Sequence, residues 1–159
     1  MADDKGEGRM TDRPQPADYP RHTFDKLRYA DTDRQGHVNN AVFATLFETG
    51  RVELLYDPAG PLHAPDGAFV IARLVIDFVD EIRWPGTVDI ATRAAAVGRS
   101  SVRLEQALFQ DDRLVAKAES VIVHVDQGDR RSRPLTPAAV AALEACRGPA
   151  SAPMAENAK

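Results

Sequence analysis

The 159-residue chain lacks several features that mark particular classes of protein. It has a single cysteine, Cys146, so no disulfide can form within the chain, and the sequence fits a reducing compartment. It has no run of about 18 apolar residues, so we expect no membrane span. Its first residues also lack the apolar core of a signal peptide, and we therefore expect a cytoplasmic protein.

Positively charged residues are also fewer than negatively charged ones. Lys and Arg number 20 against 24 Asp and Glu, which gives a net charge of −4. This balance argues against nucleic acid as a partner, whereas a small anionic ligand would need only a local basic patch. The chain length and its 43% hydrophobic content are typical of one globular domain with a hydrophobic core.

The sequence motifs of several enzyme classes are missing too. There is no GxSxG elbow, no CxxC pair and no glycine-rich phosphate loop. The four histidines (His22, His37, His63 and His124) do not have the spacing of metal ligands. We therefore expect neither a metal nor an organic cofactor.

The most informative stretch runs from Arg28 to Tyr56, where a polar turn leads into an amphipathic helix. Apolar residues recur at helical spacing from residue 41 to residue 56, and Asp57-Pro58 then ends the helix. The preceding turn concentrates polar side chains around one glycine: Asp31, Asp33, Gln35, Gly36, His37, Asn39 and Asn40. We interpret the stretch as the central helix of the fold, with a functional site at its N-terminus.

The helix has two distinct faces. Gly50 lies within the apolar face, where the missing side chain would let another backbone approach closely. On the opposite face we expect Glu48 and Arg51 to form a surface ion pair. The apolar face comprises Val42, Phe43, Leu46, Phe47, Gly50 and Leu54, and the opposite face Ala44, Glu48, Arg51 and Leu55.

The rest of the chain predicts one α+β domain over residues 21–147, between disordered tails at 1–20 and 148–159. A short first strand precedes the polar turn, and a long loop over 58–67 follows the helix. From Phe69 onward, alternating residues predict four more strands joined by tight turns, and Thr136 caps a short last helix. The strands are expected at 22–29, 69–83, 88–96, 102–108 and 113–125.

Residues 22–126 resemble the hotdog-fold thioesterases, in particular the 4-hydroxybenzoyl-CoA thioesterase and acyl-CoA thioester hydrolase group. The most specific part is the DTDRQGHVNN segment over 31–40, and the Trp84-Pro85-Gly86-Thr87 turn is a weaker match. The resemblance implies a five-stranded antiparallel sheet wrapped around one long helix. It also implies hydrolysis of acyl-CoA to a carboxylic acid and CoA, in a homodimer or homotetramer whose sites lie at the subunit interface.

The resemblance assigns roles to three positions. The second aspartate of the motif, Asp33, is expected to be catalytic. The backbone N–H at the helix start, near Asn40, is expected to polarise the thioester carbonyl. Basic residues in the turn after the 88–96 strand contact the CoA phosphates in some members, and Arg99 is the basic residue that this turn offers.

The residues themselves support a site at the turn. A helix N-terminus has free N–H groups and a partial positive charge, so it can hold an oxyanion. A carboxylate beside it can attack a carbonyl or take a proton from water. Asp33 fits either role, although as a turn residue it could instead bond only to nearby N–H groups.

The remaining residues of the turn have open roles. Gly36 would let the substrate approach closely, and Gln35 could hydrogen-bond a water or the thioester. Asn39 is expected to cap the helix or position the substrate. His37 could orient the carboxylate, bind the thioester oxygen, act as an acid, or simply satisfy backbone groups.

Three alternatives to an acyl-CoA thioesterase stay open at this point. The substrate could be carried by acyl-carrier protein, because plant thioesterases of that kind show a similar HVNN segment. A hotdog hydratase would add water to an enoyl thioester, but there the Asp and His are five apart with Asn-Pro between them. A non-catalytic acyl-thioester-binding protein would use the same fold without turnover.

Overall fold

A computed structural model of the protein describes residues 13–149. One long helix and five strands make up most of the domain, with a shorter helix after the last strand. The elements are η1 (Pro16–Asp18), β1 (Arg21–Lys26), η2 (Tyr29–Asp31), α1 (Asn40–Leu55), β2 (Gly67–Phe78), β3 (Thr87–Val97), β4 (Ser101–Gln110), β5 (Arg113–Asp126) and α2 (Pro137–Ala145).

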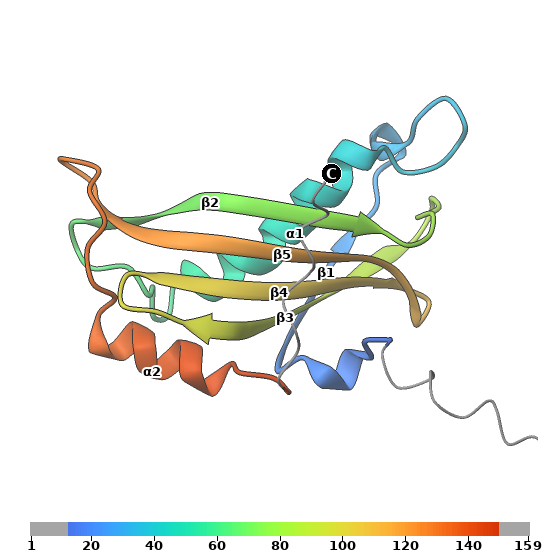
Figure 1. The fold of residues 1–159 in the computed structure, drawn as a ribbon. Helices are drawn as coiled ribbons and strands as arrows, with labels where there is room; N and C mark the ends of the chain where they lie inside the picture. Colours follow the sequence, from blue (N-terminus) through green and yellow to red (C-terminus); the bar gives the residue numbers. More distant parts are fainter. Residues whose placement is uncertain (1–12, 150–159) are drawn as a thin grey trace, which may run out of the picture.

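The five strands form one antiparallel sheet in the order β1-β3-β4-β5-β2. Strands β3, β4 and β5 are joined by tight turns, and β1 and β2 pair with the two sides of this meander. Helix α1 lies across one face of the sheet, and α2 lies beside β3 (Figure 1). The predicted hotdog fold is confirmed.

The core lies between α1 and the sheet, because the apolar face of the helix meets side chains from the central strands. Phe43 and Phe47 are buried there against Ile90 and Leu108. Gly50 is required by a close approach: a Cβ at this position would lie 2.7 Å from Nε2 of Gln106. The approach is made by side chains, and not by another backbone as the sequence suggested.

The face of α1 opposite its apolar face is more buried than its polar residues suggest. Arg51 and Leu55 are 7% and 3% exposed, so the expected surface ion pair between Glu48 and Arg51 is wrong. The Arg51 NH1 nitrogen is buried without a hydrogen-bond partner among residues 13–149. Burial lowers the pKa of this guanidinium, and the charge of Glu48 opposes that effect.

Two predicted boundaries also need correction. Residues 13–20 do not form part of a disordered tail: Tyr19 is 5% exposed and lies beneath the guanidinium of Arg93, 4.9 Å from the ring centroid. Of the expected tails, residues 1–12 and 150–159 lie outside the described residues, whereas 148 and 149 lie within them. Strand β2 ends at Phe78 instead of residue 83, because the chain leaves the sheet there.

The sheet face turned away from α1 has a ladder of alternating charges across four strands. Arg73 of β2 pairs with Glu119 of β5 at 2.6 Å, and Glu119 also pairs with Arg103 of β4 at 3.0 Å. Arg103 reaches Glu105 at 3.1 Å, and Glu105 pairs with Arg93 of β3 at 2.6 Å. Gln106 of β4, the neighbour of Glu105, bonds to α1, so the ladder lies on the other face.

Candidate active site

Asp31 forms hydrogen bonds that connect the start and the end of the polar turn before α1. The carboxylate accepts hydrogen bonds from the backbone N–H of Arg28 at 2.8 Å and from its guanidinium at 3.0 Å. The backbone oxygen of Asp31 accepts from the N–H of Asn39 at 2.8 Å, across the turn. Asp31 is 6% exposed, and its role is to hold the two ends of the turn together.

Asp33 lies at the exposed part of the same turn, and its two carboxylate oxygens differ. Oδ1 accepts from the backbone N–H groups of Gln35 at 2.8 Å and His37 at 3.2 Å. Oδ2 has no hydrogen-bond partner within residues 13–149. Gly36 has a φ of +80°, which favours glycine and lets the chain turn back towards α1. One oxygen therefore holds the turn while the other is available for chemistry.

The N-terminus of α1 presents an unbonded donor. Asn39 is the N-cap, as expected: its side chain accepts from Ala41 N–H at 3.0 Å, and its backbone oxygen accepts from Val42 N–H at 2.9 Å. The N–H of Asn40 makes no hydrogen bond to the described part of the chain. A free N–H at the positive end of a helix can stabilise a developing oxyanion.

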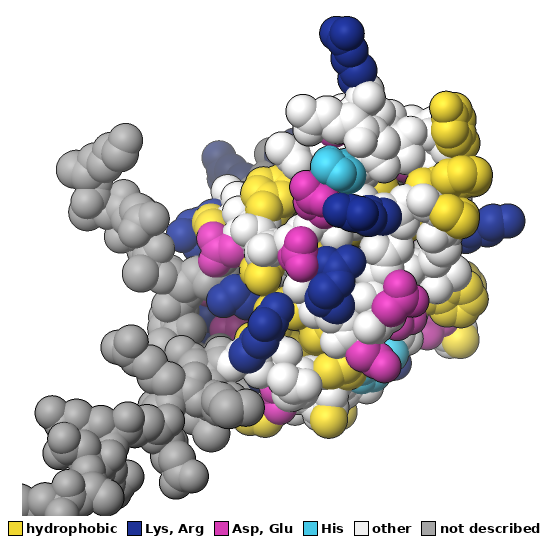
Figure 2. All heavy atoms as spheres, turned by 90° about the vertical axis from the view of Figure 1, so that its right-hand side faces the viewer, with side chains coloured by type: hydrophobic (Ala, Val, Ile, Leu, Met, Phe, Trp, Pro, Cys, Tyr) yellow, Lys and Arg dark blue, Asp and Glu magenta, His cyan; other side chains and the backbone are white. Residues whose placement is uncertain are grey.

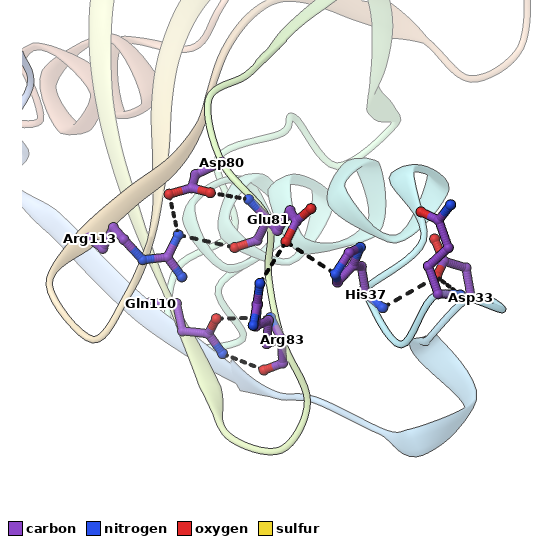
Figure 3. Close-up of polar contacts among 8 residues, drawn as sticks. Asp33, His37, Asp80, Glu81, Arg83, Gln110 and Arg113 are labelled. Atoms are coloured by element: carbon purple, nitrogen blue, oxygen red, sulfur yellow. Dashed lines mark hydrogen bonds and ion pairs between the residues drawn. The ribbon is translucent and has the colours of Figure 1, made fainter.

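His37 faces a residue that the sequence interpretation did not assign to the site. Its Nε2 lies 3.1 Å from Oε2 of Glu81, and the same oxygen accepts from Arg83 at 3.1 Å (Figure 3). Glu81 follows β2, in a segment predicted to continue that strand. No local motif marks it, because its relation to His37 depends on how two distant segments meet.

The surface around the turn carries charges of both signs. Figure 2 views this end of the molecule and shows a histidine beside acidic and basic side chains, with hydrophobic side chains along one rim. Two exposed aromatic residues also lie near the turn: Tyr29 is 74% exposed and meets Trp84 edge-on, with 5.4 Å between ring centroids. The neighbourhood can therefore contact polar and apolar groups of a ligand.

Arg99 is not brought to this turn within one chain. It lies in the turn after β3, where its backbone oxygen accepts from Leu135 N–H at 2.8 Å. The start of β3 pairs with the end of β1, near the candidate site, so Arg99 lies at the opposite end of the sheet (Figure 1). Its expected contact with CoA stays a prediction.

The described residues also bear on membrane spans, metal binding and the single cysteine. No helix within residues 13–149 is long and apolar enough to span a membrane. In the same part of the chain, no group of three His, Cys, Asp or Glu residues is arranged to hold a metal ion. Cys146 is buried, and this burial raises the pKa of its thiol.

A hotdog fold with an available carboxylate before the N-terminus of its central helix defines a class of enzymes that act on thioesters. The chain belongs to the thioesterase-like superfamily, whose family model matches residues 27–143. The protein is therefore a thioester hydrolase, and the resemblance seen in the sequence is confirmed.

Curated relatives and solved structures agree with this assignment. The acyl-CoA thioester hydrolase YbgC of Escherichia coli O6:H1 is 27% identical over 120 residues, which cover 73% of this chain and 90% of that protein. A thioesterase from Thermus thermophilus, solved with coenzyme A and Zn, is 30% identical with a TM-score of 0.68 over 79% of this chain and 98% of that one. The PA5185 protein from Pseudomonas aeruginosa is 25% identical with a TM-score of 0.79, covering 87% and 99%.

Proposed function

We propose that the protein hydrolyses an acyl-CoA thioester to a free carboxylic acid and CoA, with Asp33 as general base or nucleophile. One observation carries the proposal: the same turn presents both a carboxylate oxygen, Asp33 Oδ2, and a backbone donor, the Asn40 N–H, that make no hydrogen bond within residues 13–149. The names of the YbgC relatives and the coenzyme A bound to the Thermus thioesterase support CoA as the carrier.

The reaction needs two things from the protein. The carbonyl oxygen becomes negatively charged as its carbon is attacked, and the Asn40 N–H at the helix end would stabilise this charge. The attacking oxygen is either that of a water whose proton Asp33 accepts or that of Asp33 itself. In both cases the C–S bond then breaks and the CoA thiolate leaves. On the nucleophilic route, water then hydrolyses the acyl-Asp33 anhydride to the carboxylic acid and free Asp33. Gln35, Gly36 and Asn39 would line the approach to the carbonyl.

Thiol release from acyl-CoAs of increasing chain length, and from benzoyl-CoA and phenylacetyl-CoA, tests the proposal. We expect Asp33→Asn to lower kcat/KM by about a hundredfold, roughly 3 kcal/mol of barrier, because the amide keeps the shape but cannot act as base or nucleophile. The matched control is Asp57→Asn. Asp57 also accepts a backbone N–H in a turn, from Ala59 at 2.9 Å, but it follows the other end of α1.

Each outcome of this test has a clear meaning. Equal activity of wild type and Asp33→Asn would remove Asp33 from the mechanism. Turnover of acyl-carrier-protein substrates alone would change the carrier, and hydration of an enoyl-CoA without thiol release would favour the hydratase. Single-turnover hydrolysis in H₂¹⁸O tests the nucleophilic role of Asp33, because water that attacks the Asp33 carbon of an acyl-Asp33 anhydride leaves label in the protein.

We also propose a homodimer that forms through the free edge of β2. Within the described sheet β2 pairs only with β5. Ile71 and Phe78 of β2 are 48% and 52% exposed, and Val79 directly after the strand is 43% exposed. An apolar, unpaired strand edge favours association with a second strand. In such a dimer Arg99 would have to come from the second subunit to contact CoA at the first.

Light scattering after size exclusion tests this interface. Ile71→Arg is expected to give a monomer, because it places a charge on the contact. Phe24→Arg is the matched control: Phe24 is 67% exposed on β1, the opposite edge of the sheet. Dissociation by the β1 variant alone would assign the interface to the other edge, and a monomeric wild type would exclude the dimer.

A further inference from the structure

The segment that follows β2 is fixed in place by two side chains from the β4–β5 hairpin. The Gln110 amide accepts from the N–H of Arg83 at 3.0 Å and donates to its carbonyl at 2.7 Å. Arg113 donates to the Glu81 carbonyl at 3.2 Å and pairs with Asp80 at 2.7 Å (Figure 3). The Glu81 N–H and then Arg113 lower the pKa of Asp80.

The same segment is joined to the polar turn by buried backbone. The Val38 N–H donates to the Ile82 carbonyl at 2.9 Å, and His37 forms a β-bridge with Arg83. Val38 and Ile82 are 3% and 0% exposed, so this junction is part of the core. Glu81 and His37 therefore lie on two segments whose relative position is set by packing and not by their own side chains.

The contact between these two residues has little value for stability. The Glu81 and His37 side chains are 47% and 29% exposed, and the accompanying Arg83 is 70% exposed. Pairs so close to solvent contribute about 0–1 kcal/mol. A carboxylate that faces one nitrogen of an imidazole does, however, orient the ring and fix which nitrogen carries the proton.

We propose that Glu81 is a positioning residue that holds His37 as the Nε2–H tautomer and thereby directs the lone pair of Nδ1 to the attacking water. A neutral imidazole that donates from Nε2 accepts at Nδ1. Nδ1 makes no hydrogen bond within residues 13–149, so it is available to a water beside Asp33. This inference rests on the proposed thioester hydrolysis, and it applies whether the water attacks the thioester or an acyl-Asp33 intermediate.

The kinetic test compares substitutions at Glu81. We expect Glu81→Gln to lower kcat by about tenfold with KM within about twofold, as is typical for loss of an orienting carboxylate, and Glu81→Asp to recover part of the loss. In a His37→Gln background, Glu81→Gln should have no further effect, because the residue it positions is gone. Glu144→Gln is the control, since Glu144 on α2 is also a half-exposed glutamate that pairs with an arginine, Arg147.

A second readout does not depend on turnover. The ¹⁵N chemical shifts of the His37 ring report the protonated nitrogen, and we expect Nε2–H in wild type and a mixture of tautomers in Glu81→Ala. An Nδ1–H ring in wild type would overturn the proposal, as would equal losses from Glu81→Gln with and without His37. If wild type releases no thiol, the proposed function fails while the ring shifts still decide the orienting role of Glu81.

Discussion

The backbone N–H of Ala64 donates to Nε2 of His124 at 3.1 Å, although the two residues are 60 positions apart. The other ring nitrogen donates to the Pro134 carbonyl at 3.0 Å, which requires the proton on Nδ1. His124 is fully buried, and it thus ties the loop after α1 to the loop after β5.

We expect His124→Phe to lower the free energy of unfolding by about 2–4 kcal/mol, because the Ala64 N–H and the Pro134 carbonyl lose their partner in the core. Phenylalanine keeps the ring that packs against Phe69. Urea unfolding measures the change, and His22→Phe at an exposed position is the control. A loss below about 0.5 kcal/mol would show that the loops do not depend on this residue.

Gly50→Ala is expected to destabilise the fold in spite of its better helix propensity. The new Cβ would lie 2.7 Å from Gln106 Nε2, 2.7 Å from Ile90 Cγ2 and 2.9 Å from Thr92 Oγ1. Overlap of this kind costs about 1–3 kcal/mol, against a gain of about 1 kcal/mol in propensity. The urea midpoint should fall, whereas Gly60→Ala, where a Cβ meets nothing within 4 Å, should leave it unchanged.

Replacing Arg51 by methionine should make the protein more stable. Arg51 is 7% exposed, and its NH1 is buried with no hydrogen-bond partner among the described residues. Removal of such a charge, with a side chain of similar length, is expected to raise the free energy of unfolding by about 1–2 kcal/mol. Thermal and urea unfolding measure the gain, with exposed Arg21→Met as control, and a decrease would indicate that Arg51 is compensated in the assembled protein.

Alkaline pH should destabilise the fold through Tyr19. Burial raises the pKa of Tyr19 from 10.0 to about 12, and the nearby Arg93 charge opposes part of this increase. Below the unfolded value both states are protonated, so the full stability is present. As the pH rises from about 10 to about 12 only the unfolded chain loses the proton, and about 2–3 kcal/mol of stability is lost.

Urea unfolding from about pH 9 to about pH 11.5 measures this loss. Tyr19→Phe has no hydroxyl to ionise and should show a flatter dependence on pH than wild type. Tyr29→Phe, at a residue that is 74% exposed, should follow the wild type. Parallel curves for wild type and Tyr19→Phe would assign the alkaline loss to other groups.

Much of the candidate site could be predicted from the sequence because it is local. Asp33, His37, Asn39 and Asn40 belong to one turn, so the spacing that identifies the residues also brings them together. The cap at Asn39 and the helix that follows depend on neighbouring residues as well. The catalytic role of Asp33 is a separate matter that only kinetics can decide.

The parts that were missed depend on contacts between distant segments. Glu81 was assigned to a strand by its alternating neighbours, yet the clamp by Gln110 and Arg113 takes the chain out of the sheet. Arg51 was placed on a polar face by its helical spacing alone, and spacing does not show that tertiary packing leaves this residue only 7% exposed. The burial of Tyr19 likewise requires the cover that Arg93 provides.

The ladder of alternating charges on the outer face of the sheet has a consequence for how the strands find their partners. Successive side chains of a strand point to opposite faces, so a shift of β4 by one residue would turn Arg103 and Glu105 towards α1. Two charges would then enter the apolar layer, Arg93 would lose Glu105, and Glu119 would lose Arg103. The ladder thus favours the correct register of the strands, because its charges are paired when the four strands are aligned as observed.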